Sequence, residues 1–536
     1  MSLIILDKSQ IIYEILNFVM RVILPETIGE LKYLLLSIVF CRSMISSLKE
    51  SFTKDILRSI TLRVSLQNFR KSDEIKRSLV KVFLCNREKE PEMVQTSTHH
   101  LSTSPKTAIR GAMLTFSKDP FFHPVEECYT YESDAIIVME NGHITAVGPA
   151  EALLPALGDT PVKHYTDSII VPGFIDSHVH YPQTQIIASY GEQLIDWLNN
   201  YTFIAEQNFK DRAHADEVAE VFLREQRRNG VTSSTVFCTI FPESVEAIFA
   251  EAEKYNMRIM AGKVCMDRNA PEALLDTAEK AYDESKALIE KWHKRGRAEY
   301  VITPRFVPTS THEQLEMIGA LANEFSDTLI QSHVSENIDE IKWVKELYPD
   351  ATDYTDVYDR YGLLRERAIY GHGVHLTERE FHVLNEKGAA VAHCPTSNFF
   401  LGSGAFNVHN AKKADRAIKV GLGTDLGAGT SFSILQTMNE AYKAAQLNGA
   451  PYSSLHTFYL ASRGTAEALS LQDKVGSIAV GMEADLAVIN LKSTPIIEYR
   501  MRYADSLEEA LFIQMTLGDD RAIRATYIAG KEVYSA

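Results

Sequence analysis

Eight short apolar segments, separated by longer stretches with helical spacing, constrain most strongly how this chain can fold. The segments are rich in β-branched and aromatic residues, whereas the stretches between them place apolar residues three and four positions apart. The segments are Ile169–Val179, Ser233–Phe237, Arg258–Cys265, Tyr300–Phe306, Thr328–Val334, Ala368–His372, Ala389–His393 and Ala417–Thr424. Strand–helix units repeated in this way predict an α/β protein with a (β/α)8 TIM barrel. A doubly wound sheet is the alternative, but its glycine-rich phosphate-binding fingerprint is missing.

Strand-like sequence also lies on both sides of these units. Ala108–Ser117 and Ala135–Val147 precede them, and Asn141-Gly142 within the second segment is typical of a hairpin turn. Ser477–Leu491 and Arg524–Tyr534 follow them. We therefore expect residues 173–473 to form a barrel catalytic domain. Residues 93–172 and 474–536, from both ends of this body, would form a small discontinuous β-sandwich domain.

Residues 1–92 differ from the rest of the chain. They contain one glycine, Gly29, and their apolar clusters have roughly helical spacing. They lack the pattern of a secretory signal peptide. A polar stretch, Thr96–Lys106, follows, and Met93 stands where the composition changes. The hypothesis is that the folded catalytic body begins near Met93, and that residues 1–92 are an N-terminal helical or disordered extension of unknown role, or a mis-assigned start. Loss of activity when translation begins at Met93 would contradict it.

Composition excludes several classes of protein. With 45% hydrophobic and 24% charged residues, the chain is not intrinsically disordered. The formal net charge of −16 argues against nucleic acid as a partner. No segment is long and apolar enough for a membrane span, so no membrane partner is expected. Six cysteines without a C-x-x-C pair do not make a disulfide framework, which favours a reducing, cytoplasmic location.

Polar side chains end several of the predicted strands, which is where barrel enzymes carry their chemistry. The first strand ends at His178-Val179-His180, and residues two apart on a strand point to the same side. With His333 and Asp425 at the ends of two other strands, these imidazoles are expected to bind one divalent metal ion with an open position. His372 has three interpretations: a ligand, a hydrogen-bonding partner of bound water, or a packed histidine.

A second metal bridged by a carbamylated lysine is not expected, because the fourth strand ends Thr303-Pro304-Arg305-Phe306. A bound divalent ion lowers the pKa of water from about 15.7 toward about 7. Glu336, three residues after His333, is the natural proton shuttle, and Asp425 can both ligate the ion and orient the water. The alternative for Glu336 is a surface or helix-capping carboxylate.

These motifs resemble the amidohydrolase superfamily. The resemblance rests on Pro172–His180, His333, His372, Asp425 and Gly481–Leu486. Further stretches resemble the purine-deaminating members: Tyr181–Thr184, Tyr190–Leu198, Thr303–Phe306, His333–Glu336 and His393–Asn398. The resemblance extends from about residue 108 to the C-terminus and leaves residues 1–92 unmatched.

The resemblance implies a role for each matching residue. His178, His180, His333 and Asp425 would bind one Zn²⁺ per subunit, with iron as the alternative. Gln183, Arg305 and Phe306 would hold a purine, with His333, Glu336 and Asp425 also touching it. Glu336 would move protons, and His372 would support the hydrolytic water. The implied reaction is hydrolytic deamination of guanine to xanthine and ammonia by a metal-activated water, in purine catabolism. A homodimer is also implied.

The physical chemistry of the three base-binding residues agrees with these roles. Gln183 offers a donor and an acceptor to a purine edge, Arg305 a planar fork, and Phe306 a stacking face. Two alternatives stay open: another aminohydrolase or chlorohydrolase of the superfamily acting on a different heterocycle, and a non-catalytic scaffold. A cytidine-type zinc deaminase is not supported, because it requires a C-x-x-C pair.

Overall fold

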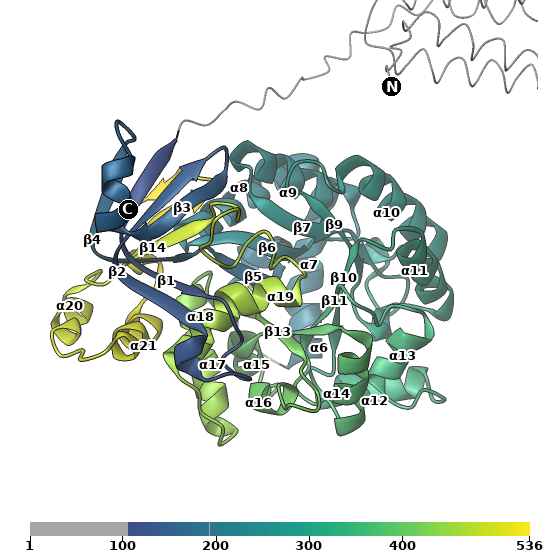
Figure 1. The fold of residues 1–536 in the computed structure, drawn as a ribbon. Helices are drawn as coiled ribbons and strands as arrows, with labels where there is room; N and C mark the ends of the chain where they lie inside the picture. Colours follow the sequence, from purple (N-terminus) through teal and green to yellow (C-terminus); the bar gives the residue numbers. More distant parts are fainter. Residues whose placement is uncertain (1–105, 192) are drawn as a thin grey trace, which may run out of the picture. The chain divides into compact units, whose positions relative to one another are not determined.

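The computed structural model describes residues 106–191 and 193–536, which form two sheets, one of them ringed by helices (Figure 1). The predictions for residues 1–92 lie outside the described residues.

The larger sheet is a nearly closed barrel of parallel strands, which confirms the predicted fold. In order around the sheet its strands are β5 (Phe174–His180), β6 (Val231–Phe237), β7 (Arg258–Gly262), β9 (Glu299–Pro304), β10 (Leu329–Val334), β11 (Ala368–His372), β12 (Ala390–His393) and β13 (Lys419–Leu422), and the short β8 (Val264–Cys265) also pairs with β9. Side-chain and backbone hydrogen bonds join the two ends of this order. Asp176 accepts from the Thr424 backbone N–H at 3.0 Å, and the Asp425 N–H donates to the His178 carbonyl at 2.8 Å.

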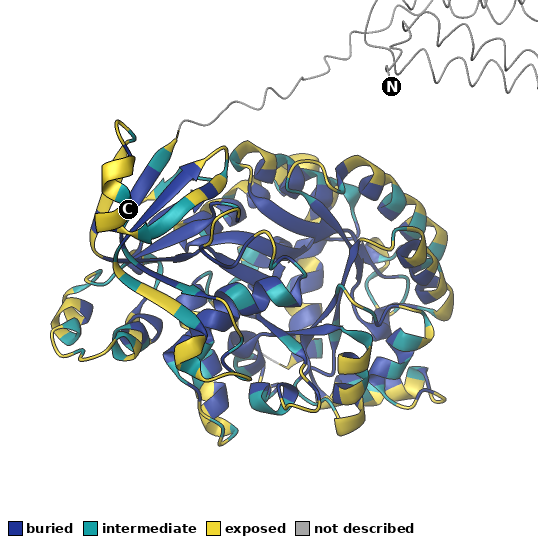
Figure 2. Ribbon diagram, viewed as in Figure 1, coloured by how far each residue is buried: buried dark blue, intermediate teal, exposed yellow. Residues whose placement is uncertain are grey.

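Helices follow most of the barrel strands and cover the outside of the barrel. They include α8 (Arg212–Arg228), α9 (Pro242–Tyr255), α10 (Ala278–Trp292), α11 (His312–Glu324), α12 (Ile338–Leu347), α13 (Tyr354–Arg360), α14 (Glu378–Lys387), α15 (Pro395–Phe400), α16 (Val408–Ala411), α17 (Ile434–Leu447), α18 (Ser454–Tyr459) and α19 (Thr465–Ala468). Figure 2 shows the barrel strands buried and the outer faces of the surrounding helices largely exposed. In the part of the chain that the structure describes, no helix combines the length and apolarity needed to cross a bilayer.

Capping chemistry corrects one predicted helix. The apolar pattern predicts a helix over Pro271–His293, but α10 begins only at Ala278. The Thr277 side chain accepts a hydrogen bond from the Lys280 backbone N–H and so caps the helix there. The preceding residues Glu272–Leu274 form a separate 3₁₀ turn. A cap inside an otherwise periodic stretch therefore decides where the helix starts.

The second sheet takes strands from both ends of the described chain, as expected. Its seven strands run in the order β16 (Lys531–Ser535), β15 (Ile523–Ile528), β14 (Leu486–Asn490), β4 (Val162–Pro172), β1 (Thr107–Phe116), β2 (Tyr129–Glu140) and β3 (His143–Pro149). They hydrogen-bond as one continuous sheet. Asn141 and Gly142 join β2 to β3 with φ of 52° and 83°, the left-handed backbone of the predicted hairpin turn. Two further helices, α20 (Pro495–Met501) and α21 (Leu507–Leu517), lie between β14 and β15 in the chain.

The predicted strand Ile169–Val179 divides between the two sheets. Its first part belongs to β4 of the second sheet, and its last part is β5 of the barrel. Gly173 separates them, and a Cβ at this position would lie 2.3 Å from the Thr232 hydroxyl oxygen. The chain therefore passes from one sheet to the other at the residue where only glycine fits against β6.

The C-terminal segment Gly481–Leu486 is anchored on the barrel by two acidic side chains. Glu483 pairs with Arg258 of β7 and, at 2.6 Å, with Arg297. Asp485 also pairs with Arg297, at 2.5 Å, and accepts from the Ala529 backbone N–H at 2.8 Å. All of these side chains are buried or nearly so. This part of the family-like sequence therefore joins the second sheet to the barrel.

Candidate active site

The barrel gathers the candidate site residues at the carboxyl ends of its strands. His178 and His180 lie in β5, His333 in β10, His372 in β11, and Asp425 just after β13. One pocket is lined by His180, Gln183, Leu194, Trp197, Leu198, Arg305, Phe306, His333, Glu336, His372, Leu401, Asp425 and Ala428. His178 is buried directly behind it. The residues singled out in the sequence thus meet around a single cavity.

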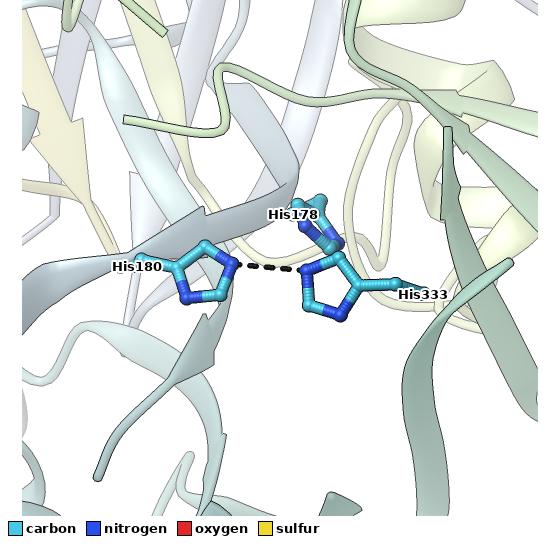
Figure 3. A group of neighbouring side chains, drawn as sticks. All are labelled: His178, His180 and His333. Carbon is cyan, nitrogen blue, oxygen red and sulfur yellow. Dashed lines mark hydrogen bonds between the residues drawn. The ribbon is translucent and has the colours of Figure 1, made fainter. Parts of the chain in front are cut away.

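Three imidazoles point toward a common point (Figure 3). The Nε2 atoms of His180 and His333 lie 3.2 Å apart. The Asp425 Oδ1 atom lies 3.4 Å from His180 Nε2 and 3.5 Å from His178 Nε2. Two ligands of a tetrahedral Zn²⁺ with bonds of about 2.0–2.1 Å would be about 3.3 Å apart. These three separations therefore fit a small divalent ion.

The protonation of these imidazoles also fits a metal site. Burial lowers the pKa of His178, and it lowers the pKa of His180 and of His333 well below the ordinary value, so the rings are neutral near pH 7. The His333 Nδ1–H donates to the Arg305 carbonyl at 2.6 Å, which leaves the Nε2 lone pair facing the cluster. The buried Nε2 of His178 has no hydrogen-bond partner among the described residues. A metal ion would supply that missing partner.

Glu336 and His372 form a second pair at the edge of this cluster. His372 Nε2 lies 3.4 Å from Glu336 Oε2 and 3.9 Å from Asp425 Oδ2. Burial raises the pKa of Glu336 to about 7, although the charge of His372 opposes the shift. Burial acts to lower the pKa of His372, but the Glu336 and Asp425 carboxylates outweigh it and the pKa rises. A carboxyl group that is partly protonated near neutral pH can both give and take a proton.

The base-binding candidates line the other side of the pocket. Gln183 follows β5 and is buried against Gly427, where a Cβ would lie 2.0 Å from the Gln183 Oε1 atom. Arg305 and Phe306 follow β9, and both are nearly fully buried. With Leu194, Trp197 and Leu198, these residues offer apolar walls and a few polar groups, the usual lining of a site for a flat heterocycle.

The backbone is strained at several of these strand ends. Ser335, His372 and Asp425 have φ of 48°, 72° and 47°, a conformation that side-chain-bearing residues seldom adopt. Gly371 lies against the candidate metal ligand His178, because a Cβ there would be 2.5 Å from His178 Cε1. Such strain persists only where the surrounding structure enforces it, and it commonly accompanies functional geometry.

Three residues of this site were not assigned a role from the sequence. Asn398 Oδ1 accepts from His372 Nδ1–H at 2.8 Å, and the Ser403 hydroxyl donates to Glu336 at 3.2 Å. Glu206 pairs with Arg305 at 2.8 Å. Of these three residues, only Asn398 could have been singled out from the sequence, because it ends the family-like stretch His393–Asn398. Ser403 and Glu206 lie in ordinary loop and helical sequence.

Comparison with known proteins defines the class. The amidohydrolase family matches residues 169–533, so the chain belongs to this family.

Within the family, several similar proteins are guanine deaminases. The guanine deaminase of Escherichia coli is 46% identical over 430 residues, which are 80% of this chain and 97% of that protein. The guanine deaminase of Homo sapiens is 35% identical over 377 residues, or 68% of this chain and 82% of that protein. The solved E. coli structure superposes with a TM-score of 0.78 and covers 80% of this chain and 99% of its own. A Clostridium acetobutylicum guanine deaminase with guanine bound in the active site has a TM-score of 0.72 at 29% identity. This match covers 80% of this chain and 100% of that chain.

Proposed function

We propose that this protein hydrolyses guanine to xanthine and ammonia. The proposal is carried by one observation: three of the four candidate metal ligands, the Glu336–His372 pair and the three base-binding candidates line one pocket, and the fourth ligand, His178, lies beside two of the others. The guanine deaminases that resemble this chain over nearly their whole length support it.

The proposed metal ligands are His178, His180, His333 and Asp425, holding one Zn²⁺ per subunit, with iron as the alternative. Three neutral imidazoles and a carboxylate are a donor set that suits zinc. A divalent ion bound there lowers the pKa of a coordinated water so that hydroxide becomes available near neutral pH.

The proposed chemistry uses two further residues. Glu336 takes a proton from the water and gives it to a ring nitrogen beside C2, which makes C2 more electrophilic. It then takes the proton of the new hydroxyl group on C2, which becomes the carbonyl, and gives it to the departing amino group. His372, held by Asn398 and facing both Glu336 and Asp425, orients the water. Asp425 also contacts this water. Water adds to C2 and ammonia leaves, so the reaction consumes one water for each ammonia released.

The proposed specificity comes from Gln183, Arg305 and Phe306. The amide of Gln183 pairs with a donor and an acceptor on the purine edge, the Arg305 guanidinium donates to ring oxygen and nitrogen, and the Phe306 ring stacks on the base. A purine lacking guanine's hydrogen-bonding pattern would leave buried polar groups unpaired, and this cost excludes it.

Three further proposals concern the division into domains, the location in the cell and the oligomeric state. We propose a discontinuous domain of residues 93–172 and 474–536 beside a barrel domain of residues 173–473. We propose a cytoplasmic location from the cysteine usage, and a homodimer working in purine catabolism from the resemblance. Light scattering of the purified chain measures its oligomeric state directly.

The decisive experiment measures ammonia release from guanine, adenine, cytosine and a chlorinated triazine. The full chain is purified, its bound metal is quantified, and xanthine is followed by its absorbance. Turnover of guanine far above the other rings supports the proposal. Preferential turnover of another ring would identify the alternative aminohydrolase or chlorohydrolase. No turnover of any ring by fully metallated protein would favour a non-catalytic scaffold.

A further inference from the structure

A buried ion pair joins a residue of the pocket wall to a residue outside the pocket lining. Both carboxylate oxygens of Glu206 accept from Arg305 Nη1, at 3.0 Å and 2.8 Å. The two residues are 99 positions apart in the chain. Glu206 belongs to α7 (Phe203–Glu206) and is completely shielded from solvent. Arg305 lines the pocket, whereas Glu206 does not. Any effect of Glu206 on a ligand must therefore act through Arg305.

The same short helix fixes the guanidinium in two ways. Glu206 binds Nη1, and the Phe203 ring lies under the guanidinium carbon, 5.4 Å from it to the ring centroid. Because both carboxylate oxygens use one nitrogen, this ion pair does not involve Nε or Nη2. The Arg305 carbonyl meanwhile accepts from the His333 imidazole. Arg305 is thus held at its side chain by α7 and at its backbone by a candidate metal ligand.

The pairing also sets the charge that a ligand meets. An unpaired buried guanidinium would attract an anion, whereas a guanidinium beside a carboxylate is close to neutral as a unit. This distinction matters because substrate and product differ in acidity. Deamination replaces the amino group at C2 by a carbonyl, adds an N–H at N3 and leaves the N1–H between two carbonyls, so the product ionises more easily than guanine. The product therefore carries part of a negative charge at mildly alkaline pH.

We propose that Glu206 is a positioning residue that holds Arg305 and neutralises it, so that the pocket prefers the neutral base over the anionic product. This inference rests on the proposed function. Glu206 thereby limits inhibition by xanthine, and its carboxylate charge is the property that matters.

The test compares Glu206→Gln, Glu206→Asp and the original protein. For each, KM for guanine, kcat and the inhibition constant of xanthine are measured at pH 6 and pH 8.5, together with bound metal. E206Q keeps the size of the side chain but removes its charge. We expect its xanthine inhibition constant, relative to KM, to fall roughly tenfold or more at pH 8.5 and much less at pH 6. E206D keeps the charge but shortens the side chain, and it should raise KM while leaving the relative xanthine affinity near the original value.

A matched control removes a carboxylate from another buried arginine cluster. Glu299 pairs with Arg258 at 3.2 Å and with Arg367 at 2.8 Å, at the opposite end of β9 from Arg305. Glu299→Gln should lower stability without changing the ratio of the xanthine inhibition constant to KM.

Two outcomes would overturn the inference. One is an E206Q protein with full metal content whose xanthine inhibition constant and KM change by the same factor at both pH values. The other, which decides the matter if E206Q cannot be obtained folded, is an E206D protein with unchanged KM. A failure of the proposed function looks different, because the original protein itself would then release no ammonia from guanine.

Discussion

The Nε2 atoms of His180 and His333 lie 3.2 Å apart, although 153 residues separate them in the chain. Two neutral imidazoles that approach so closely, each with a lone pair available, gain most when a cation lies between them and their neighbours. The barrel supplies this proximity by ending β5 and β10 at the same rim. Substituting single residues at these strand ends therefore tests the proposed site.

Removing one candidate ligand should remove the metal. His333→Ala deletes one of three converging nitrogens. We expect the bound metal to fall and turnover to drop by more than about a hundredfold, because losing even a residue that only hydrogen-bonds to a metal ligand can cost that much. Metal analysis and the ammonia assay measure both. His382, an exposed histidine of α14, provides the control His382→Ala. Full metal occupancy and unchanged turnover in H333A would exclude His333 as a ligand.

Gly371→Ala tests the tight approach behind the same cluster. The new methyl group would lie 2.5 Å from His178 Cε1, so the imidazole must move. Displacing a reacting geometry by about 1 Å can cost about a hundredfold in rate, and we expect a loss of that order with reduced metal content. Gly148→Ala in β3 is the control, because its added methyl would meet Leu153 at an ordinary 3.7 Å. Equal activity of the two variants would contradict the close contact.

Glu336→Gln should separate metal binding from proton transfer. The amide can still accept from Ser403 but can no longer carry the proton, so turnover should fall by about 10²–10⁴ while metal remains bound. Glu386→Gln, at an exposed position of α14, controls for the loss of a negative charge. If E336Q instead loses its metal, Glu336 is a ligand rather than a shuttle.

His456 should make the protein less stable in acid. Burial beside Phe121 lowers its pKa to about 4, and His409 adds to the shift while Asp119 opposes it. The unfolded chain, with a histidine pKa of about 6.5, binds more protons than the folded chain between these values, so stability falls as the pH drops from about 6.5 to about 4. Because the ring is only half-buried, we expect a contribution of about 1–3 kcal/mol.

The measurement for His456 is the thermal unfolding midpoint between pH 4 and pH 7. His456→Phe removes the titrating group, and its midpoint should decline less across this range than that of the original protein. His382→Gln, at an exposed position, should follow the original protein. Parallel curves for H456F and the original protein would show that other groups govern the acid sensitivity.

Much of the barrel could be predicted because its signals are local. Buried parallel strands are short and continuously apolar, and polar residues such as His333 and Asp425 stand out where those strands end. The spacing of His178 and His180 follows directly from the two-residue period of a strand.

The features that could not be predicted depend on contacts between distant segments or on steric detail. Glu206 lies in unremarkable helical sequence, and nothing near it indicates that its partner is Arg305, 99 residues away. The division of the first predicted strand at Gly173 depends on the approach of Thr232 from β6. The start of α10 depends on one hydrogen bond from Lys280 to Thr277, which periodicity does not reveal.

The attachment of Glu483 and Asp485 to Arg258 and Arg297 has a consequence for how the molecule can be divided. An excised barrel would retain both arginines but lose two of the carboxylates that balance them, leaving cationic groups buried without sufficient compensation. Shortening the chain from its C-terminus should therefore yield insoluble barrel rather than a smaller enzyme.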